Sequence, residues 1–390
     1  MKIPIYLDYN ATTPVDKRVL DVMLPYFTEK FGNASSRTHA FGWIATDAVK
    51  IAREQVAQLI NCLAQEIIFT SGATEAINLA IKGVWDNYQG EGKHIITVKT
   101  EHKAVLDTCE ALQKKGATIT YLSVNRDGVI DIDELKNALT PQTILVAVMY
   151  ANNETGVIQP IKQIAKLVHA NNSFFICDAT QAIGKINIDV DDEHIDLMCM
   201  SAHKMYGPKG VGALYVRRKD PRVTLFPQID GGGHERGLRS GTLNVTGIIG
   251  LGKACEIAQK EMWDDAARIS KLRTKLEQFL CDLENVFING STKNRLFNTT
   301  NITFQGIRSE ELIIKIPHIA VAMGSACTSA TAEPSYVLKA MGLNDNDAQS
   351  SIRFSLGKYT TDAEITEAIE SVTKAVIEIR NSIITNKPTT

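Results

Sequence analysis

Short runs of β-branched and apolar residues alternate with amphipathic stretches from about residue 60 to residue 216, and this alternation restricts the chain to few folds. Between the runs, apolar residues such as Ile161, Ile164 and Val168 recur at helical spacing. Strands that alternate with helices form a mostly parallel sheet covered by helices. The sequence therefore predicts an α/β fold with a seven-stranded, mostly parallel sheet. Its candidate strands are residues 67–70, 95–98, 118–124, 144–149, 174–177, 197–200 and 212–216.

The pattern changes after the glycine run 231–233, where a long helical region at about 246–283 leads into a second unit. We expect a large domain of residues 15–258 and a small α+β domain of residues 1–14 and 259–390. The expected strands of the small domain are 286–289, 301–304 and 351–355, and its expected helices lie near 310–316, 335–341 and 362–384.

Composition excludes several classes of protein. The 390 residues carry 42 Lys plus Arg against 44 Asp plus Glu, so a net charge of -2 gives no bulk attraction to nucleic acid or to an anionic membrane. No apolar run approaches the roughly 20 residues of a membrane span, and the first residues do not resemble a signal peptide. Seven cysteines without a Cys-x-x-Cys pair suggest neither a disulfide framework nor structural zinc. We expect a cytoplasmic enzyme.

Lys204 and Asp178 both follow apolar strands, at the strand ends where parallel sheets bind ligands. Alone, Lys204 would more often be a solvated lysine, and Asp178 would more often cap the segment after it. As a pair they suit pyridoxal phosphate. The amine can form a Schiff base with the aldehyde carbon, and the carboxylate can hold the pyridine nitrogen in its protonated form.

Further strand ends carry residues suited to the same cofactor. The small-residue turn 70–75, which includes Ala73 and Thr74, can bind phosphate at a helix start, and it matches neither the dinucleotide nor the P-loop pattern. His102 follows the strand 95–98 and can stack on a planar cofactor and move protons, although a lone histidine is more often structural. Asn153 either ties a turn or binds a substrate carboxylate.

One cysteine differs from the rest. Cys327 lies in a run of small residues, 324–333, that has no apolar periodicity and predicts an exposed, flexible loop. The alternative is an idle surface thiol. A thiol on a moving loop would allow a pyridoxal enzyme to take sulfur from cysteine as a persulfide and carry it elsewhere, leaving alanine. The other six lie in or beside apolar patterns, as small buried hydrophobes do: Cys62, Cys109, Cys177, Cys199, Cys255 and Cys281.

Several of these strings together resemble the cysteine desulfurases, pyridoxal-phosphate enzymes of the aminotransferase class V family, and in particular the iron–sulfur-cluster branch and its nitrogen-fixation relatives. The resemblance runs from residues 6–14 to residues 351–357 and is carried by 100–103, 152–154, 178–181, 203–210 and 324–329. It implies a fold-type-I homodimer that converts L-cysteine to L-alanine. The resulting persulfide would supply sulfur for iron–sulfur cluster assembly, with tRNA thiolation as a further use.

The resemblance also implies roles for single residues. Lys204 would bind the cofactor aldehyde, Asp178 the pyridinium nitrogen and Gln181 the ring oxygen, while His102 stacks on the ring and assists proton transfer. Cys327 would accept the sulfur and contact an iron–sulfur cluster transiently, with no resident metal. The phosphate would be held by Ala73, Thr74, Ser201, His203 and, from the second subunit, Thr242. The substrate carboxylate would be held by Asn153 and Arg353, and Asn153 would also contact the cofactor.

The resemblance further implies an iron–sulfur scaffold protein and other sulfur acceptors as partners. Two features depart from it. Ala322 and Met323 precede Gly324 where relatives usually have two serines, and the sequence ends at Thr390, short of the extended tail that docks the scaffold in housekeeping members. Scaffold docking is therefore an open expectation. A class V aminotransferase, which would not need Cys327, and a non-catalytic adaptor that keeps the fold are the alternative functions.

Overall fold

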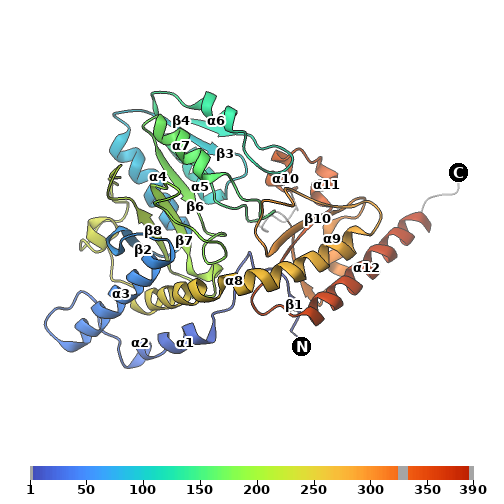
Figure 1. Ribbon diagram of the computed structural model, residues 1–390, viewed down its shortest axis with the longest axis horizontal. Helices are drawn as coiled ribbons and strands as arrows, with labels where there is room; N and C mark the ends of the chain where they lie inside the picture. Colours follow the sequence, from blue (N-terminus) through green and yellow to red (C-terminus); the bar gives the residue numbers. More distant parts are fainter. Residues whose placement is uncertain (1–2, 324–332, 386–390) are drawn as a thin grey trace.

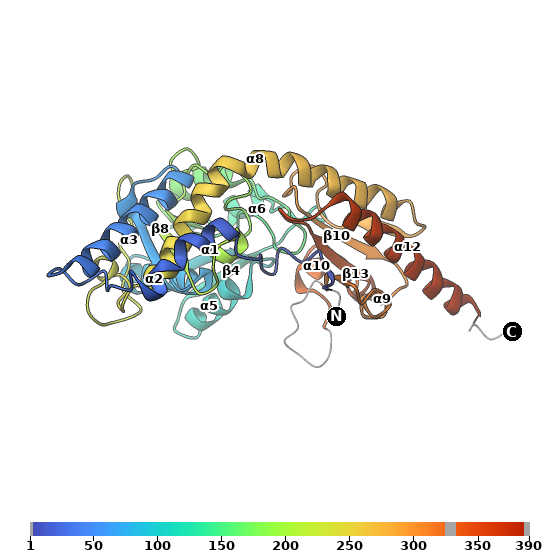
Figure 2. The same cartoon turned by 90° about the horizontal axis from the view of Figure 1, so that it is seen from below.

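The structure is a computed structural model that describes residues 3–323 and 333–385. A seven-stranded sheet forms the centre of a larger unit, and a four-stranded sheet forms the centre of a smaller one. The two units lie side by side, and the long helix α8 (Val245–Cys281) runs across both (Figures 1 and 2). The predicted α/β class with a mostly parallel seven-stranded sheet is confirmed.

The seven-stranded sheet has the order β2-β8-β7-β6-β5-β3-β4, and each of the seven predicted strands is present among the described residues. Pairing is parallel except around β8, which runs antiparallel to both β2 and β7. Predicted and observed ends differ by at most two residues. The strands are β2 (Ile67–Thr70), β3 (His94–Val98), β4 (Thr118–Leu122), β5 (Thr143–Ala147), β6 (Phe174–Asp178), β7 (Leu197–Ser201) and β8 (Gly212–Val216).

Helices cover both faces of this sheet, and each face has its own apolar cluster. Helices α4 (Ala73–Tyr88) and α5 (Lys103–Gln113) cover one face. The other face is covered by α1 (Lys17–Met23), α3 (Ala40–Leu59), α6 (Ile132–Ala138), α7 (Ile161–Ala170) and the first half of α8. This three-layer arrangement explains why the inner strands β5, β6 and β7 are mostly apolar, since both of their faces are covered.

The smaller unit has an antiparallel sheet of order β12-β13-β10-β9. Its predicted strands and helices are present, whereas the two-residue strands β1 (Ile5–Tyr6), β11 (Ile319–Ala320) and β12 (Ala322–Met323) are too short to give a periodic signal. The remaining elements are β9 (Val286–Ile288), β10 (Thr299–Phe304), β13 (Ser351–Ser355), α9 (Ser309–Lys315), α10 (Tyr336–Ala340), α11 (Asp345–Gln349) and α12 (Asp362–Thr385).

Helix α8 contributes to the apolar cores of both units. Ile248 and Leu251 pack in the core of the larger unit, and Ile269 and Leu272 pack in the core of the smaller one. The expected boundary after residue 258 falls inside this helix and stays a prediction. Within the described part of the chain, no helix is long and apolar enough to cross a bilayer.

Candidate active site

A cavity of about 590 Å³ opens at the carboxyl ends of the parallel strands, where the strand-end residues were expected to meet. Side chains from β6, β7 and the start of α4 line it together with the N-terminal residues Asn10 and Ala11. Ten predicted site residues line this cavity: Ala73, Thr74, His102, Asn153, Asp178, Gln181, Ser201, His203, Lys204 and Arg353. The structure thus brings these predicted residues, which are far apart in the chain, together around one cavity.

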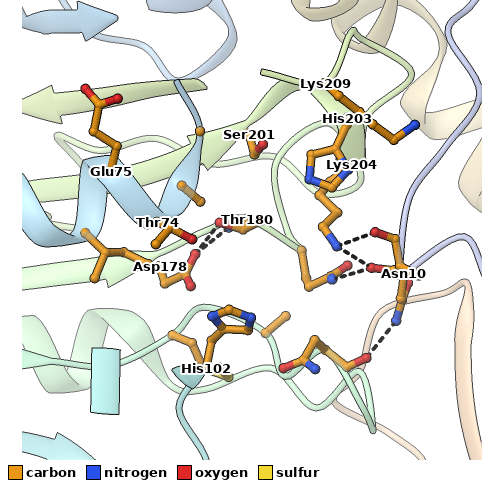
Figure 3. Close-up of a pocket in the computed structure, with 18 of the residues that line it drawn as sticks. Asn10, Thr74, Glu75, His102, Asp178, Thr180, Ser201, His203, Lys204 and Lys209 are labelled. Atoms are coloured by element: carbon orange, nitrogen blue, oxygen red, sulfur yellow. Dashed lines mark hydrogen bonds between the residues drawn. The ribbon is translucent and has the colours of Figure 1, made fainter. Parts of the chain in front are cut away.

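Asp178 is the last residue of β6, and its carboxylate is bound to the turn that follows. One carboxylate oxygen, Oδ1, accepts hydrogen bonds from both the backbone N–H of Thr180, at 2.9 Å, and the Thr180 hydroxyl (Figure 3). The capping interpretation and the ligand-binding interpretation are therefore compatible, because Asp178 caps this turn while it lines the cavity.

Lys204 lies at the end of the short 3-10 helix η2 (Ala202–Lys204), which directly follows β7. Its Nζ atom donates hydrogen bonds to the backbone oxygens of Asn10, at 2.6 Å, and Ala11, at 2.8 Å (Figure 3). Burial, together with the nearby Arg353 guanidinium, lowers the Lys204 pKa to about 8, although the Asp178 carboxylate opposes this shift. A larger share of this amine is therefore neutral at pH 7 than in an exposed lysine.

The start of α4 is suited to an anion. Among the described residues, no side chain at the N-cap position Gly72 accepts a hydrogen bond from the first turn of α4. The backbone N–H groups of this turn therefore lie at the cavity without a capping side chain. Gly212 keeps β8 close to this turn, because a Cβ atom there would lie 2.7 Å from the Cα of Gly72. Ser201 and His203 line the same end of the cavity. Burial, aided by Lys204, lowers the His203 pKa to about 4, which keeps this imidazole neutral.

His102 is the N-cap of α5, and its Nδ1 accepts the backbone N–H of Ala104 at 3.1 Å. Because Nδ1 is an acceptor in this contact, the proton of the neutral ring is assigned to Nε2. Figure 3 shows His102 across the cavity from Lys204. The imidazole is thus held in one orientation at the edge of the cavity.

Arg353 lies on β13 of the smaller sheet and brings a buried cation to the cavity. One guanidinium nitrogen donates to Asp8 Oδ1 at 2.6 Å, and the other donates to the backbone oxygen of Asn153 at 3.0 Å. The Nε atom is buried without a hydrogen-bond partner in the described part of the chain. These contacts orient the guanidinium beside the Asn153 amide.

Two amide oxygens in the cavity wall, Oε1 of Gln181 and Oδ1 of Asn153, are buried and have no hydrogen-bond partner among the described residues. A buried polar atom left unpaired costs about 1–3 kcal/mol. A ligand that donates hydrogen bonds to these oxygens would remove that cost. The uncapped helix start, the strand-end carboxylate of Asp178 and the partly neutral amine of Lys204 match the phosphate, ring nitrogen and aldehyde of pyridoxal phosphate, so the residues fit this group.

One predicted residue that the structure describes does not line the cavity. Thr242 is exposed between η3 (Glu235–Gly237) and α8, so its expected contact with a second subunit stays a prediction. Cys327 lies outside the described residues. The wall also contains residues to which the sequence assigned no role of their own, namely Asn10, Ala11, Glu75, Thr180, Lys209 and Gly210. The turn 70–75 had pointed to Glu75, but no local pattern pointed to Asn10.

Comparison with known proteins identifies the family. The aminotransferase class-V family model matches residues 5–367. A cysteine desulfurase IscS of Anaeromyxobacter sp. (strain Fw109-5) is 54% identical over 381 residues, which cover 97% of this chain and 94% of the relative. The chain belongs to the cysteine desulfurases of the aminotransferase class-V family. The expected resemblance is therefore confirmed.

Solved structures of cysteine desulfurase relatives share this fold. A NifS-like protein superposes with a TM-score of 0.89 at 39% identity, covering 95% of this chain and 99% of its own. A structure described as SspA in complex with cysteine has a TM-score of 0.81 at 37% identity, covering 92% of this chain and 100% of its own. Class-V cysteine desulfurases depend on pyridoxal phosphate, which agrees with the wall residues described above.

Proposed function

We propose that this chain is a pyridoxal-phosphate-dependent cysteine desulfurase that transfers the sulfur of L-cysteine to Cys327 and releases L-alanine. The observation that carries the proposal is that Lys204, Asp178 and Arg353 line one cavity in a chain of this family. An amine, a carboxylate and a guanidinium then face one amino-acid substrate and its cofactor. The supply of sulfur for iron–sulfur cluster assembly, and for tRNA thiolation, belongs to the same proposal.

Different residues of the cavity wall would bind different groups of the cofactor. The start of α4 at Ala73 and Thr74, with Ser201 and His203, would hold the phosphate, while Asp178 would hold the ring nitrogen. Gln181 would contact the ring oxygen, and its side chain is already fixed by a 3.0 Å hydrogen bond to Asn10. When bound, pyridoxal phosphate supplies an electron sink for the charge left by removal of an amino acid α-proton.

Two groups are suited to move that proton. The Lys204 amine has a lowered pKa, so the Nζ atom can accept a proton near neutral pH and return it. His102, with its proton assigned to Nε2, presents a second donor on the other side of the cavity. Arg353 and Asn153 would bind the substrate carboxylate through guanidinium and amide N–H groups, and so fix the α-carbon between these two groups.

The sulfur acceptor is assigned to Cys327 because the six described cysteines are unsuited to the task. Burial is the largest cause that raises the pKa of each of these six thiols, and a thiol with a raised pKa is a poor nucleophile. In the transfer, the Cys327 thiolate forms a bond to the substrate sulfur as the substrate carbon–sulfur bond breaks. The electron pair of the broken bond stays on the substrate carbon, which takes up a proton, and the carbon skeleton leaves as alanine.

A homodimer is part of the proposal. Large apolar side chains are exposed between residues 20 and 51, including Phe27 and Phe31 at 61% and 63% exposure and Trp43 at 55%. Exposed apolar clusters of this kind mark interaction surfaces. A second subunit on this face would account for them and would allow Thr242 to contact the partner's cofactor. A scaffold protein and other sulfur acceptors, and a cytoplasmic location, are proposed from the family alone.

The decisive experiment gives the holoenzyme L-cysteine without any keto acid. We expect one alanine for each sulfur released by an added thiol, and we expect persulfide on Cys327 by mass spectrometry. Cys327→Ser should keep the cofactor but lose the persulfide, whereas the control Cys62→Ser should keep both. Strict dependence on a keto acid would instead identify an aminotransferase. If the wild-type protein shows no cofactor absorbance that Lys204→Ala abolishes, the chain is a non-catalytic adaptor.

A further inference from the structure

Helix α10 and its N-cap Ser335 lie where the two units meet (Figures 1 and 2). The helix packs in a small apolar cluster of its own, built around Val337, Leu338 and Met341. The two residues at its start, Ser335 and Tyr336, instead reach the loops of the larger unit that carry Asn153 and His102. No role in the proposed reaction has yet been given to either residue.

Tyr336 contacts the turn that presents His102. Its hydroxyl donates a hydrogen bond to the backbone oxygen of Glu101 at 2.7 Å, and Lys103 Nζ lies 5.0 Å from its ring centroid. Glu101 and Lys103 are the two neighbours of His102. From the inner side, the buried Glu101 carboxylate accepts the Met149 N–H at 2.6 Å. The His102 turn is thus held from both sides, and Tyr336 provides a contact from the smaller unit.

Ser335 contacts the loop that presents Asn153. Its hydroxyl donates to Glu154 Oε2 at 2.6 Å, and both side chains are buried. Ser335 Oγ also accepts the Leu338 N–H at 3.2 Å, so the helix cap and the loop contact share this atom. Because Glu154 follows Asn153 directly, this bond fixes the loop next to the amide proposed to bind the substrate carboxylate.

We propose that Ser335 and Tyr336 are positioning residues that fix the two loops carrying Asn153 and His102. This inference rests on the proposed desulfurase function. Each residue acts on a different part of the reaction. Tyr336 orients the imidazole that moves a proton, so its loss should lower kcat. Ser335 orients the amide that binds the carboxylate, so its loss should raise KM for L-cysteine.

Conservative variants separate the two effects. Tyr336→Phe keeps the ring and removes only the hydroxyl, and we expect kcat to fall about three- to tenfold with KM little changed, the effect of one neutral hydrogen bond. Ser335→Ala should raise KM by a similar factor, and Ser335→Thr, which keeps a hydroxyl, should restore it. Tyr121→Phe on β4, outside the cavity wall, is the control for loss of a tyrosine hydroxyl.

The outcomes are distinguishable. If the wild-type protein forms no alanine from cysteine, the proposed function fails, whatever the variants do. If the wild type is active, equal kinetics in Tyr336→Phe and Tyr121→Phe, or equal KM values in Ser335→Ala and Ser335→Thr, overturn the positioning role. Loss of thermal stability without the split between kcat and KM would mean a structural role only and would also overturn it. Faster amide exchange at residues 101–104 in Tyr336→Phe supports it.

Discussion

The Nζ atom of Lys204 lies 2.6 Å from the backbone oxygen of Asn10, a residue 194 positions earlier in the chain. The N-terminal segment therefore reaches the ends of the central strands and receives the amine there. Backbone oxygens are neutral acceptors, so they hold the amine in place without the charge of a carboxylate partner. Burial, and secondly the Arg353 charge, lowers the Lys204 pKa to about 8, while the Asp178 and Asp8 carboxylates oppose the shift.

The first prediction concerns cofactor uptake. An amine of pKa about 8 is roughly one-tenth neutral at pH 7, against roughly 0.03% for an ordinary lysine. The rate at which cofactor-free protein binds pyridoxal phosphate should therefore rise about tenfold per pH unit below pH 8 and level off above it. Stopped-flow absorbance measures this rate. Lys204→Ala should lose the absorbance change, and the exposed-lysine control Lys271→Ala should keep it. A binding rate that still rises above about pH 10 would show that Lys204 has an ordinary pKa.

Asp178→Asn tests the strand-end carboxylate. Asparagine keeps an oxygen that can accept the Thr180 N–H, so the turn after β6 should stay folded, but the negative charge is lost. A charge-assisted hydrogen bond is worth about 1.5–3 kcal/mol, so kcat/KM for L-cysteine should fall on the order of 10- to 100-fold. Steady-state kinetics and a thermal unfolding scan on the same preparation check both statements. Unchanged kcat/KM would remove Asp178 from the cofactor site.

The strands and the strand-end residues could be predicted because each depends on a local pattern. Apolar runs mark β6 and β7, and parallel strands then bring Asp178 and Lys204 to the same sheet edge. Asn10 was not predicted as a wall residue, and Arg353 was predicted only through the family resemblance, because the larger unit receives both from distant parts of the chain. The buried ionisable residues Lys185 and Glu154 also gave no sequence signal, since burial of a charged residue depends on the tertiary packing around it.

Lys185 is a buried lysine just behind the cavity wall, and its Nζ donates to the Gln181 backbone oxygen at 2.7 Å. Burial, and secondly the charge of Lys204, lowers the Lys185 pKa to about 7. The folded state thus holds this proton less tightly than the unfolded state, whose pKa is near 10.5. Between these two values wild-type stability should rise with pH, because the cost of deprotonating the buried amine disappears.

Lys185→Met should remove that pH dependence. At pH 7 or below the variant should be more stable by a few kcal/mol, because the cost of the buried amine exceeds the roughly 1–3 kcal/mol for the Gln181 oxygen left unpaired. At about pH 10 the advantage should vanish or reverse. Urea unfolding across this pH range gives the comparison. A difference between variant and wild type that stays constant with pH would show that Lys185 has an ordinary pKa.

Glu154 should give a pH dependence of folding stability opposite to that of Lys185. Burial raises the pKa of this carboxyl to about 7, although the Ser335 hydroxyl and the Arg353 charge oppose the shift. The folded state therefore binds this proton more tightly than the unfolded state, whose pKa is near 4.5. As pH rises between the two values, the stability from the protonated group is lost, by an upper estimate of roughly 3 kcal/mol.

Glu154→Gln should abolish this loss while keeping the contact with α10. The glutamine oxygen can still accept the Ser335 hydroxyl, now 2.6 Å from Glu154 Oε2, and the side chain never ionises. We expect wild type and variant to have similar free energies of unfolding at about pH 4 and the variant to be more stable at about pH 8. Glu110→Gln on the exposed face of α5 is the control, since a surface carboxylate contributes little. A variant less stable than wild type at about pH 8 would mean that the Glu154 charge, through Arg353, stabilises the fold when ionised.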